Sequence, residues 1–465
     1  MQVMTKIYDT VAGLCAYMAD LWSASFFTGF SCITRPERER VRATIRGRFP
    51  SIYGDDGLVR ALEREEFTKG FAQSFGSFIE EQKDCGDMYV LMGALVAIDA
   101  TLKNVLKEEA ESFTREGLGG CGFSLNTNRA KTGIGLLPRF HCCWERKGRL
   151  SHRYNRLDNF LSNLLVIETG GLWDIMDRHI FLKADVFPDF ARTRSLKVAA
   201  TPLKLTPPFA IVPDTRGKVN TFHVEYDLSR EAEDNELVWQ KILKAGNAGA
   251  DIILFPEMMG HTSVEEFVRG RIKGLGPEEA KRLPGLIVLP STMINGFNTA
   301  VVLGRDGERI CTQAKHIPFK MEIDGEWCLE GMTSSLEMSV LHYEGIGRIA
   351  ILICKDFIST DHMERMMRSF KLTLILSPSR STGSYDFKQS FDVCAHDDCN
   401  VVWINTCSAL ASGKEGNFKC IGYTRQRVGR DADESQMLMP MKTCEGAFRG
   451  ECKGDCLFFS TIKGV

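Results

Sequence analysis

The sequence has no uninterrupted apolar run that is long enough to cross a membrane, which takes about 18 or more residues. The two most apolar stretches are Val11–Phe30 and Met88–Leu102, and Asp20 and Asp99 interrupt them. We expect both stretches to form buried helices. The first residues also show no convincing cleavage site for a secretion signal. The sequence therefore predicts a cytoplasmic protein without a membrane partner.

A strong excess of charge of either sign is also missing, since 58 basic and 60 acidic residues give a formal net charge of −2. Such a chain has no general attraction to nucleic acid. The basic segment Arg35–Phe49 is interpreted as a solvated helix face whose arginines pair with Glu37 and Glu39. Tyr53–Asp56 (YGDD) matches a motif of polymerase palms, but only 52 residues precede it. We interpret it as a loop, and nucleic acid is not an expected partner.

Pairs of cysteines separated by two residues are absent, although the chain has 16 cysteines. Scattered cysteines of this kind are typical of reduced thiols in a cytosolic protein and not of a disulfide framework. The nearest approach to a cluster is Cys444, Cys452 and Cys456, whose spacing matches no zinc pattern. We therefore expect neither a metal nor a cofactor.

The chain of 465 residues is too long for one ordinary core, so two domains are expected. Residues 1–195 carry mainly helical patterns, among them Asp55–Gln82, Tyr89–Phe113 and Tyr154–Glu168. We interpret residues 1–195 as a mainly helical accessory domain of unknown function. Prolines then mark a change of texture, at Pro202, Pro207, Pro208 and Pro213.

Residues 196–465 alternate short apolar runs with amphipathic helices, which favours an α/β domain. The segment Asn298–Ile317 predicts a hairpin that turns at Asp306-Gly307. The other predicted strands are Thr221–Leu228, Asp251–Glu257, Gly285–Thr292, Arg348–Cys354, Leu372–Ser379 and Asn400–Thr406, and the predicted helices are Asp234–Ala250, Thr360–Leu372 and Tyr385–Asp398.

A carboxylate, an amine and a thiol each follow one of these strands: Glu257, Lys315 and Cys354. A carboxylate can serve as a general base, a lysine can stabilise an oxyanion, and a cysteine can act as a nucleophile. Taken alone, Cys354 is better explained as a buried core thiol, because free cysteine is among the most buried residue types. The three residues together, in this order and at strand ends, favour a catalytic site.

These stretches resemble the nitrilase (carbon–nitrogen hydrolase) superfamily from residue 219 onward. "EDNELVWQKILKAGNAGADIILFPE" resembles its first helix and second strand, "FNTAVVLGRDGERICTQAKH" its hairpin leading to the lysine, and "CNVVWINTCSA" the strand that closes the site. The resemblance implies a four-layer α-β-β-α sandwich for residues 196–465. It also implies a homo-oligomer and a Glu–Lys–Cys triad of Glu257, Lys315 and Cys354.

The resemblance further implies an amide-like small-molecule substrate and a thioester intermediate on Cys354. The backbone N–H of Lys355 is expected as a second oxyanion donor, and Asp356 retains the family's aspartate. Glu322 is the candidate for the family's second glutamate, with Glu326 left open as an alternative. The run "FISTDHMER" departs from the family pattern, so hydrolysis and acyl transfer both stay open.

The main alternative is a catalytically idle nitrilase-like scaffold within a larger complex. The unassigned residues 1–195 would then bind a protein partner. Nitrilase-like domains also occur joined to reverse transcriptases in bacterial antiviral systems, which leaves a defence role as part of this alternative. A cysteine-directed probe separates the two interpretations, because an enzyme is expected to react at Cys354.

Overall fold

The computed structural model describes residues 2–21, 24–142, 156–169, 175–204, 206–383, 385–397, 399–411, 421–426, 438–441 and 456–463. The chain divides into two compact units. Unit 1 comprises Met1–His141 and Glu145–Trp173, and unit 2 comprises Cys142–Trp144 and Asp174–Val465. The domain boundary expected after residue 195 falls inside unit 2, at the start of a strand of one of its sheets.

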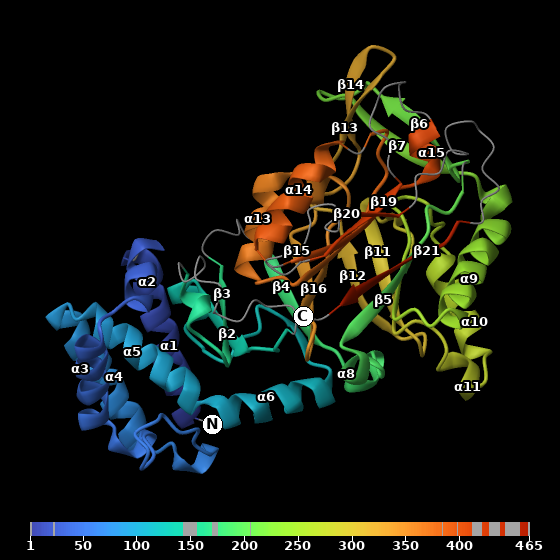
Figure 1. Ribbon diagram of the computed structural model, residues 1–465. Coiled ribbons are helices and arrows are strands. Elements are labelled where there is room, and N and C mark those ends of the chain that lie inside the picture. Colours follow the sequence, from blue (N-terminus) through green and yellow to red (C-terminus); the bar gives the residue numbers. More distant parts are fainter. Residues whose placement is uncertain are drawn as a thin grey trace. The chain divides into compact units, whose positions relative to one another are not determined.

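Unit 1 is mainly helical, as the sequence predicts (Figure 1). Thr34, Thr68 and Asp87 cap three of its helices by accepting backbone N–H bonds, and Gly86 ends one helix with a positive φ. Its helices are α1 (Gln2–Leu21), α2 (Ala24–Ser31), α3 (Arg35–Arg48), α4 (Lys69–Cys85), α5 (Met88–Thr101), α6 (Lys103–Glu116) and α7 (Arg129–Thr132), with short 3-10 turns at Pro50–Ile52, Arg64–Glu66 and Leu157–Asn159 and strands β1 (Gly119–Cys121), β2 (Ile134–Pro138) and β3 (Leu164–Glu168).

Helix α5 is buried on nearly all sides at the centre of this unit's apolar core. No single helix in the described part of the chain has the length and apolarity of a membrane span. Helices α5 and α6 have that length and apolarity only when taken together, and they are bent by 55° relative to each other.

The helix expected over Tyr154–Glu168 is wrong. Leu164–Glu168 forms strand β3, which pairs antiparallel with β2. The cause is a tertiary contact that local periodicity does not contain. The buried carboxylate of Asp99 accepts the backbone N–H groups of Ser162, Asn163 and Leu164, which fixes the segment as it enters the strand.

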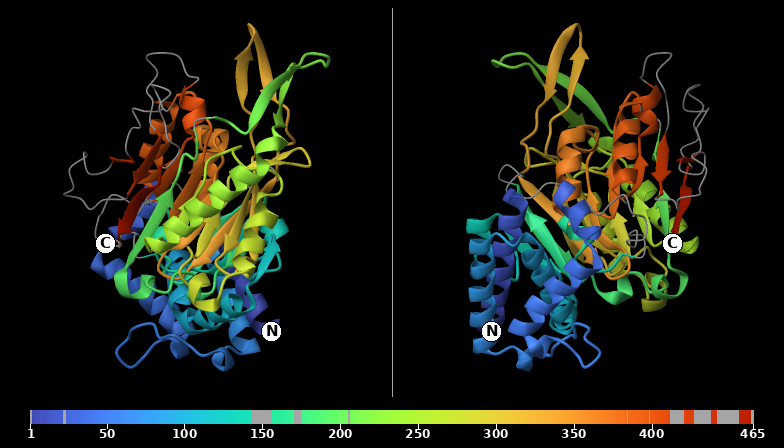
Figure 2. Two further views of the ribbon diagram at one scale, coloured as in Figure 1. Left: turned by 90° about the vertical axis from the view of Figure 1, so that its right-hand side faces the viewer. Right: turned by 60° about the vertical axis from the view of Figure 1, so that its left-hand side comes forward.

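Unit 2 contains two sheets that face each other (Figures 1 and 2). The first has the order β10-β11-β9-β8-β5-β21, with β12 paired to β11. The second contains β4-β15-β16-β17-β18-β19-β20 in that order. The bounds in the first sheet are β5 Ser195–Ala200, β8 Ile252–Leu254, β9 Leu286–Val288, β10 Thr292–Ile294, β11 Phe297–Gly304, β12 Arg309–Ala314 and β21 Phe458–Lys463; those in the second are β4 Met176–Phe181, β15 Glu337–Tyr343, β16 Gly347–Ile351, β17 Leu374–Pro378, β18 Asn400–Ile404, β19 Gly422–Arg425 and β20 Leu438–Met441.

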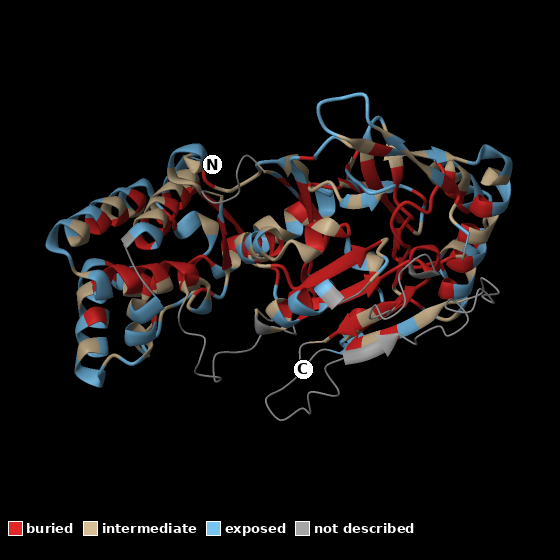
Figure 3. Ribbon diagram, turned by 90° about the horizontal axis from the view of Figure 1, so that it is seen from above, coloured by how far each residue is buried: buried red, intermediate tan, exposed pale blue. Residues whose placement is uncertain are grey.

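Helices cover the outer face of each sheet, so unit 2 is the four-layer α-β-β-α sandwich that the resemblance implies (Figures 1 and 2). The central strands β8, β9, β16, β17 and β18 are buried on both faces, and the buried residues are red in Figure 3. Outside the first sheet lie α9 (Glu231–Asn247), α10 (Val264–Lys273) and α11 (Pro277–Ala280), and outside the second lie α12 (Lys355–Ile358), α13 (Thr360–Ser369) and α14 (Tyr385–His396).

A small third sheet with the order β13-β14-β7-β6 extends beyond one end of the sandwich (Figure 1). Its strands are β6 (Phe209–Asp214), β7 (Thr221–Tyr226), β13 (Lys320–Ile323) and β14 (Glu326–Glu330). This end is also where β8, β12, β16 and β17 finish, since the loops after them are hydrogen-bonded to one another. The backbone N–H groups of Glu257 and Cys354 donate to Ser379 and Pro378 respectively, at 3.4 and 2.9 Å. The remaining short elements of unit 2 are 3-10 turns at Ala184–Val186 and Leu228–Arg230 and helices α8 (Phe190–Thr193) and α15 (Cys407–Ala411).

Candidate active site

The structure brings Glu257, Lys315 and Cys354 together at this end of the sandwich. Lys315 Nζ lies 2.8 Å from Glu257 Oε1. The backbone N–H and carbonyl groups of Arg380 connect Glu257 and Cys354. Its N–H donates to Glu257 Oε2 at 2.8 Å, and its carbonyl accepts from Cys354 Sγ at 3.7 Å. All three side chains are about 1% exposed, so carboxylate, ammonium and thiol share one desolvated site.

Cys354 has a strained backbone, with φ 44° and ψ −95°. L-residues avoid this region, and such strain persists only where surrounding contacts hold it. Here the Cys354 N–H donates to Pro378, and the Cys354 carbonyl accepts from Phe357 and Ile358 at the start of α12. Strand β16 therefore ends in a sharp turn that presents the thiol to the loop after β17. An ordinary core cysteine needs no such geometry.

Glu257 sits in the loop after β8, and a chain of hydrogen bonds fixes that loop. Ser291 Oγ accepts from the Met258 N–H and donates to Asn298 Oδ1. Asn298 Nδ2 in turn donates to Glu257 Oε1 at 2.9 Å. Its backbone carbonyl accepts the N–H of Lys315. Asn298 thus positions both the carboxylate and the amine, a role that the sequence analysis did not assign to it.

The second carboxylate on Lys315 belongs to Glu330. Its Oε2 lies 2.6 Å from Lys315 Nζ and also accepts the Phe319 N–H, while its Oε1 accepts from Asn298 Nδ2. Glu322, and its alternative Glu326, are exposed on the β13–β14 hairpin. The expectation that one of them contacts the lysine is therefore corrected. The hairpin carries both away from Lys315 and returns Glu330 to it.

Opposing effects set the charge of the site. Burial alone lowers the pKa of Lys315, but the charges of Glu257 and Glu330 more than offset this and hold that pKa above its usual value. Burial raises the pKa of the Cys354 thiol, and the Glu257 charge adds to the shift while Lys315 opposes it. The resting site thus favours an ammonium and a neutral thiol, so the thiol needs a base before it can act as a nucleophile.

Asp356 and Lys355 contribute from the turn into α12. The buried carboxylate of Asp356 accepts the N–H groups of His316 and Ile317, which anchors the segment that follows Lys315. Burial raises the pKa of Asp356, and His316 opposes the shift. The Lys355 side chain is partly exposed. Its backbone N–H has no acceptor among the described residues, so that donor is available to a ligand.

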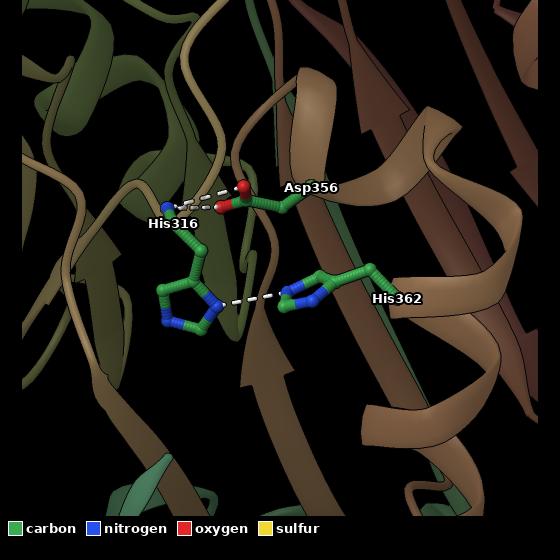
Figure 4. Close-up of side chains that lie close together, drawn as sticks. All are labelled: His316, Asp356 and His362. Carbon is green, nitrogen blue, oxygen red and sulfur yellow. Dashed lines mark hydrogen bonds between the residues drawn. The ribbon is translucent and has the colours of Figure 1, made fainter. Parts of the chain in front are cut away.

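His316, Asp356 and His362 form the one group in the described ranges whose side-chain nitrogen and oxygen atoms lie as close together as metal ligands do. These atoms are within 4.8 Å of one another (Figure 4). These atoms already have partners within the protein. His316 Nδ1 lies 2.9 Å from His362 Nε2, and the Asp356 oxygens face the backbone N–H groups after Lys315. These contacts suit a structural link between α13 and the lysine loop. Of the cysteine cluster considered from the sequence, Cys444 and Cys452 lie outside the described residues.

The YGDD segment forms an exposed turn in unit 1, where Tyr53 bridges to Val59 and the Asp56 side chain accepts the Leu58 N–H. The Asp56 carboxylate therefore stabilises the turn, in agreement with the interpretation of this segment as a loop.

Arg380 and Asn405 are further residues at the site that the sequence analysis missed. Asn405 Oδ1 accepts the Ser381 N–H, and its Nδ2 donates to the Ser381 carbonyl, which fixes the loop carrying Arg380. Both residues follow strands, at β17 and β18. A search of every strand end for polar residues would have found them.

No family model matches the chain, and neither does any curated protein. Solved structures give partial likenesses. One is a double mutant of the amidase from Nesterenkonia sp. AN1 in complex with acrylamide, with TM-score 0.36, 15% identity, and coverage of 51% of this chain and 84% of that one. Another form of that amidase, with an acetamide moiety covalently added at its active-site cysteine, has TM-score 0.35 and 15% identity over 50% of this chain and 84% of that one. The NitFhit protein of C. elegans has TM-score 0.35 and 14% identity over 58% of this chain and 61% of that one. These structures are what about half of the chain is similar to.

Proposed function

We propose that this protein is a carbon–nitrogen hydrolase that cleaves an amide-like small molecule through a thioester on Cys354. The observation that carries the proposal is the position of Lys315. It is a buried ammonium held between Glu257 and Glu330, beside a thiol on strained backbone. Burying three charged groups next to a thiol costs free energy of folding, and such clusters are typical of catalytic sites.

Acylation begins when Cys354 Sγ attacks the amide carbonyl carbon and its proton passes to Glu257. The carbonyl π electrons move to oxygen, and Lys315 Nζ and the Lys355 N–H donate to the resulting oxyanion. As the C–N bond breaks, Glu257 gives the proton to the leaving amine, and a thioester remains on Cys354. Protons and charges balance within this step.

In deacylation, a water molecule attacks the thioester carbonyl and Glu257 takes its proton. The C–S bond then breaks, the acid leaves, and Glu257 returns the proton to the thiolate. If an amine attacks in place of water, the same residues transfer the acyl group. Glu330 and Asn298 act through Lys315 and Glu257, and are positioning residues.

The test combines turnover with detection of the intermediate. A panel of primary amides is screened for ammonia release, and the protein is examined by intact mass spectrometry during turnover. We expect an acyl adduct that maps to Cys354 and is absent from Cys354→Ala. A folded protein that neither turns over any amide nor reacts with iodoacetamide at Cys354 would instead be a scaffold, and the proposal would fail.

Assembly through the sandwich, and binding of a protein partner by the helical unit, stay predictions. Sedimentation of the full chain tests the first. A chain that remains monomeric at high concentration contradicts it.

A further inference from the structure

The guanidinium of Arg380 lies beside the proposed catalytic residues with no hydrogen bond or ion pair to any described residue. Its backbone contacts both Glu257 and Cys354, as described above. Its side chain crosses to the small third sheet, where the guanidinium carbon lies 5.1 Å from the ring centroid of Phe209. Stacking on a ring satisfies a face of the guanidinium but none of its N–H donors.

Three buried polar atoms of this loop and the nearby strands lack a hydrogen-bond partner in the described part of the chain. They are Arg380 Nε, the Tyr226 hydroxyl and Thr292 Oγ1. The Tyr226 ring packs edge-on, at 5.8 Å, against Phe209, the ring that the Arg380 guanidinium also contacts. The Tyr226 hydroxyl lies near Thr292 and the backbone of Met293. Buried polar groups in native proteins are nearly always paired, so the unpaired Arg380 Nε beside the proposed catalytic residues indicates a polar ligand.

The charge of Arg380 indicates which kind of ligand. Burial lowers the pKa of Arg380, while the nearby charges of Glu257 and Glu330 act in the opposite direction. An arginine remains charged in such a setting. Both glutamates already have Lys315 as their partner, and the Arg380 side chain pairs with neither. A largely buried guanidinium that makes no hydrogen bond or ion pair to the described residues keeps its N–H donors for a ligand, and its planar shape fits a carboxylate with two parallel hydrogen bonds.

We propose that Arg380 binds a carboxylate carried by the same substrate whose amide is cleaved at Cys354. The substrate class is then an amide with a carboxylate a short spacer away, such as the monoamide of a small dicarboxylic acid or an N-acyl amino acid. In this proposal the Tyr226 hydroxyl is a second donor to the carboxylate, because its ring packs on the same Phe209 ring that the guanidinium contacts. This inference rests on the proposed hydrolase function and narrows its substrate.

Binding is measured separately from turnover, so that the two proposals fail separately. Calorimetry on Cys354→Ala compares succinamic acid with 4-oxopentanamide, its neutral counterpart of similar shape. It also compares N-propanoylglycine with its neutral counterpart N-(2-oxopropyl)propanamide. Succinamic acid carries its carboxylate on the acyl half, whereas N-propanoylglycine carries it on the amine half. We expect at least one carboxylate to bind about 10–100-fold more tightly than its neutral counterpart, as for a hydrogen bond to a charged group. The preferred pair identifies the half that carries the anion.

The variants then assign the effect to the guanidinium. In the Cys354→Ala background, Arg380→Met should remove the preference for the carboxylate, and Arg380→Lys should restore part of it. Tyr226→Phe, which keeps the ring, should weaken carboxylate binding by about 3–10-fold, as for one hydrogen bond. The matched control is Arg216→Met, because Arg216 is exposed on the β6–β7 hairpin and pairs with Asp214. It removes the same charge from the small sheet that the Arg380 side chain contacts, and it should leave the preference intact.

Equal binding of carboxylates and neutral amides, or an equal loss in Arg380→Met and Arg216→Met, would overturn the carboxylate site even if simple amides are hydrolysed. Arg380-dependent binding without turnover in the parent protein would support the site and count against the hydrolase. In a parent protein that does turn over, the ratio of kcat/KM for anionic over neutral amide should fall about 10–100-fold in Arg380→Met.

Discussion

Both units bury carboxylates that hold backbone N–H groups, but only unit 2, among the described residues, also buries charges that bind one another. In unit 1, Asp99 is the one acidic or basic residue that is buried among the described residues. Its carboxylate accepts backbone N–H groups at the start of β3. In unit 2, Glu257, Lys315 and Glu330 are buried together and bind one another. Asp99 holds a chain segment in place, whereas the unit 2 cluster sets the charge around a thiol. The partner of a buried carboxylate is therefore more informative than its burial.

The buried cysteines lead to the same conclusion. Cys15 in α1 and Cys354 are both fully buried, and burial raises the pKa of each thiol. Cys15 lies in regular helix among apolar side chains of the core. Cys354 has a positive φ and lies against the Arg380 carbonyl near Glu257. A raised thiol pKa thus does not distinguish the two cysteines, whereas the strained backbone and the nearby carboxylate do.

The largest expected effect would break or uphold this comparison directly. Cys354→Ser should lower turnover by at least about 1,000-fold, because an alcohol is far harder to ionise than a thiol. Cys15→Ser should keep turnover and lower only the free energy of unfolding, by about 1–3 kcal/mol, because it places a hydroxyl in an apolar core. Amide turnover and urea unfolding are measured on both. Parental turnover in a folded Cys354→Ser protein would make Cys354 a core residue like Cys15.

The second test compares the two buried carboxylates. Glu257→Gln keeps the shape of the side chain but removes the proposed base, so turnover should fall by about 100–10,000-fold. Asp99→Asn should leave turnover in place and lower the free energy of unfolding by about 1–3 kcal/mol, because it weakens the acceptor for the backbone N–H groups of Ser162, Asn163 and Leu164. If Asp99→Asn lost as much activity as Glu257→Gln, the functional distinction between the units would be wrong.

The three residues of the site could be found from the sequence because each follows a strand that the pattern predicts. The strands Ile252–Leu254 and Gly347–Ile351 can be predicted from their runs of apolar residues. In this sandwich the residues that follow them lie at the same end. The order of layers came from the family resemblance and not from the pattern. Glu330 was missed because its approach to Lys315 depends on the pairing of β13 with β14, in which Lys320 faces Leu329. Spacing along the chain does not reveal which end of a hairpin returns to the site.

The missed strand β3 and the missed Arg380 have a different cause. Leu164–Glu168 is compatible with either a helix or a strand, and Asp99, more than 60 positions earlier, decides between them. Arg380 lies two residues after the end of β17, so the sequence could show that it is a polar residue near a strand end but not what its side chain contacts. What makes Arg380 notable is the absence of a partner for its guanidinium, and that property exists only in the folded chain.

The third prediction sharpens the role of the buried amine. Lys315→Ala should lower kcat by about 100–1,000-fold, the cost of losing one oxyanion donor, with a smaller change in KM. Single-turnover kinetics should place the loss in thioester formation. An equivalent rise in KM with unchanged kcat would mean that Lys315 binds the ground state and does not stabilise the oxyanion.

The fourth prediction concerns the corrected glutamate. Glu330→Gln should lower kcat by about 10–100-fold, because it removes one of the two carboxylates that orient Lys315. Glu322→Gln, on the exposed hairpin, is the matched control and should change turnover little. If Glu322→Gln had the larger effect, the hairpin would have to adopt another register during catalysis.

The smallest expected effect is a pH dependence that belongs to unit 2. Burial lowers the pKa of His362 to about 4, and the charges of His316 and Arg365 act in the same direction. In the unfolded chain a histidine titrates near pH 6.5. The contribution of neutral His362 is therefore complete above about pH 6.5. It is lost as the pH falls toward 4, because the unfolded chain then takes up a proton that the folded chain does not.

His362→Gln should thus lose less free energy of unfolding than the parent protein between pH 7.5 and pH 4.5, by about 1–2 kcal/mol after allowance for partial exposure. Urea unfolding at the two pH values measures the difference. His223→Gln is the control, since His223 is exposed on β7. Parallel losses in the parent protein and in His362→Gln would show that His362 is protonated without cost in the fold. The link between α13 and the lysine loop would then hold in either charge state.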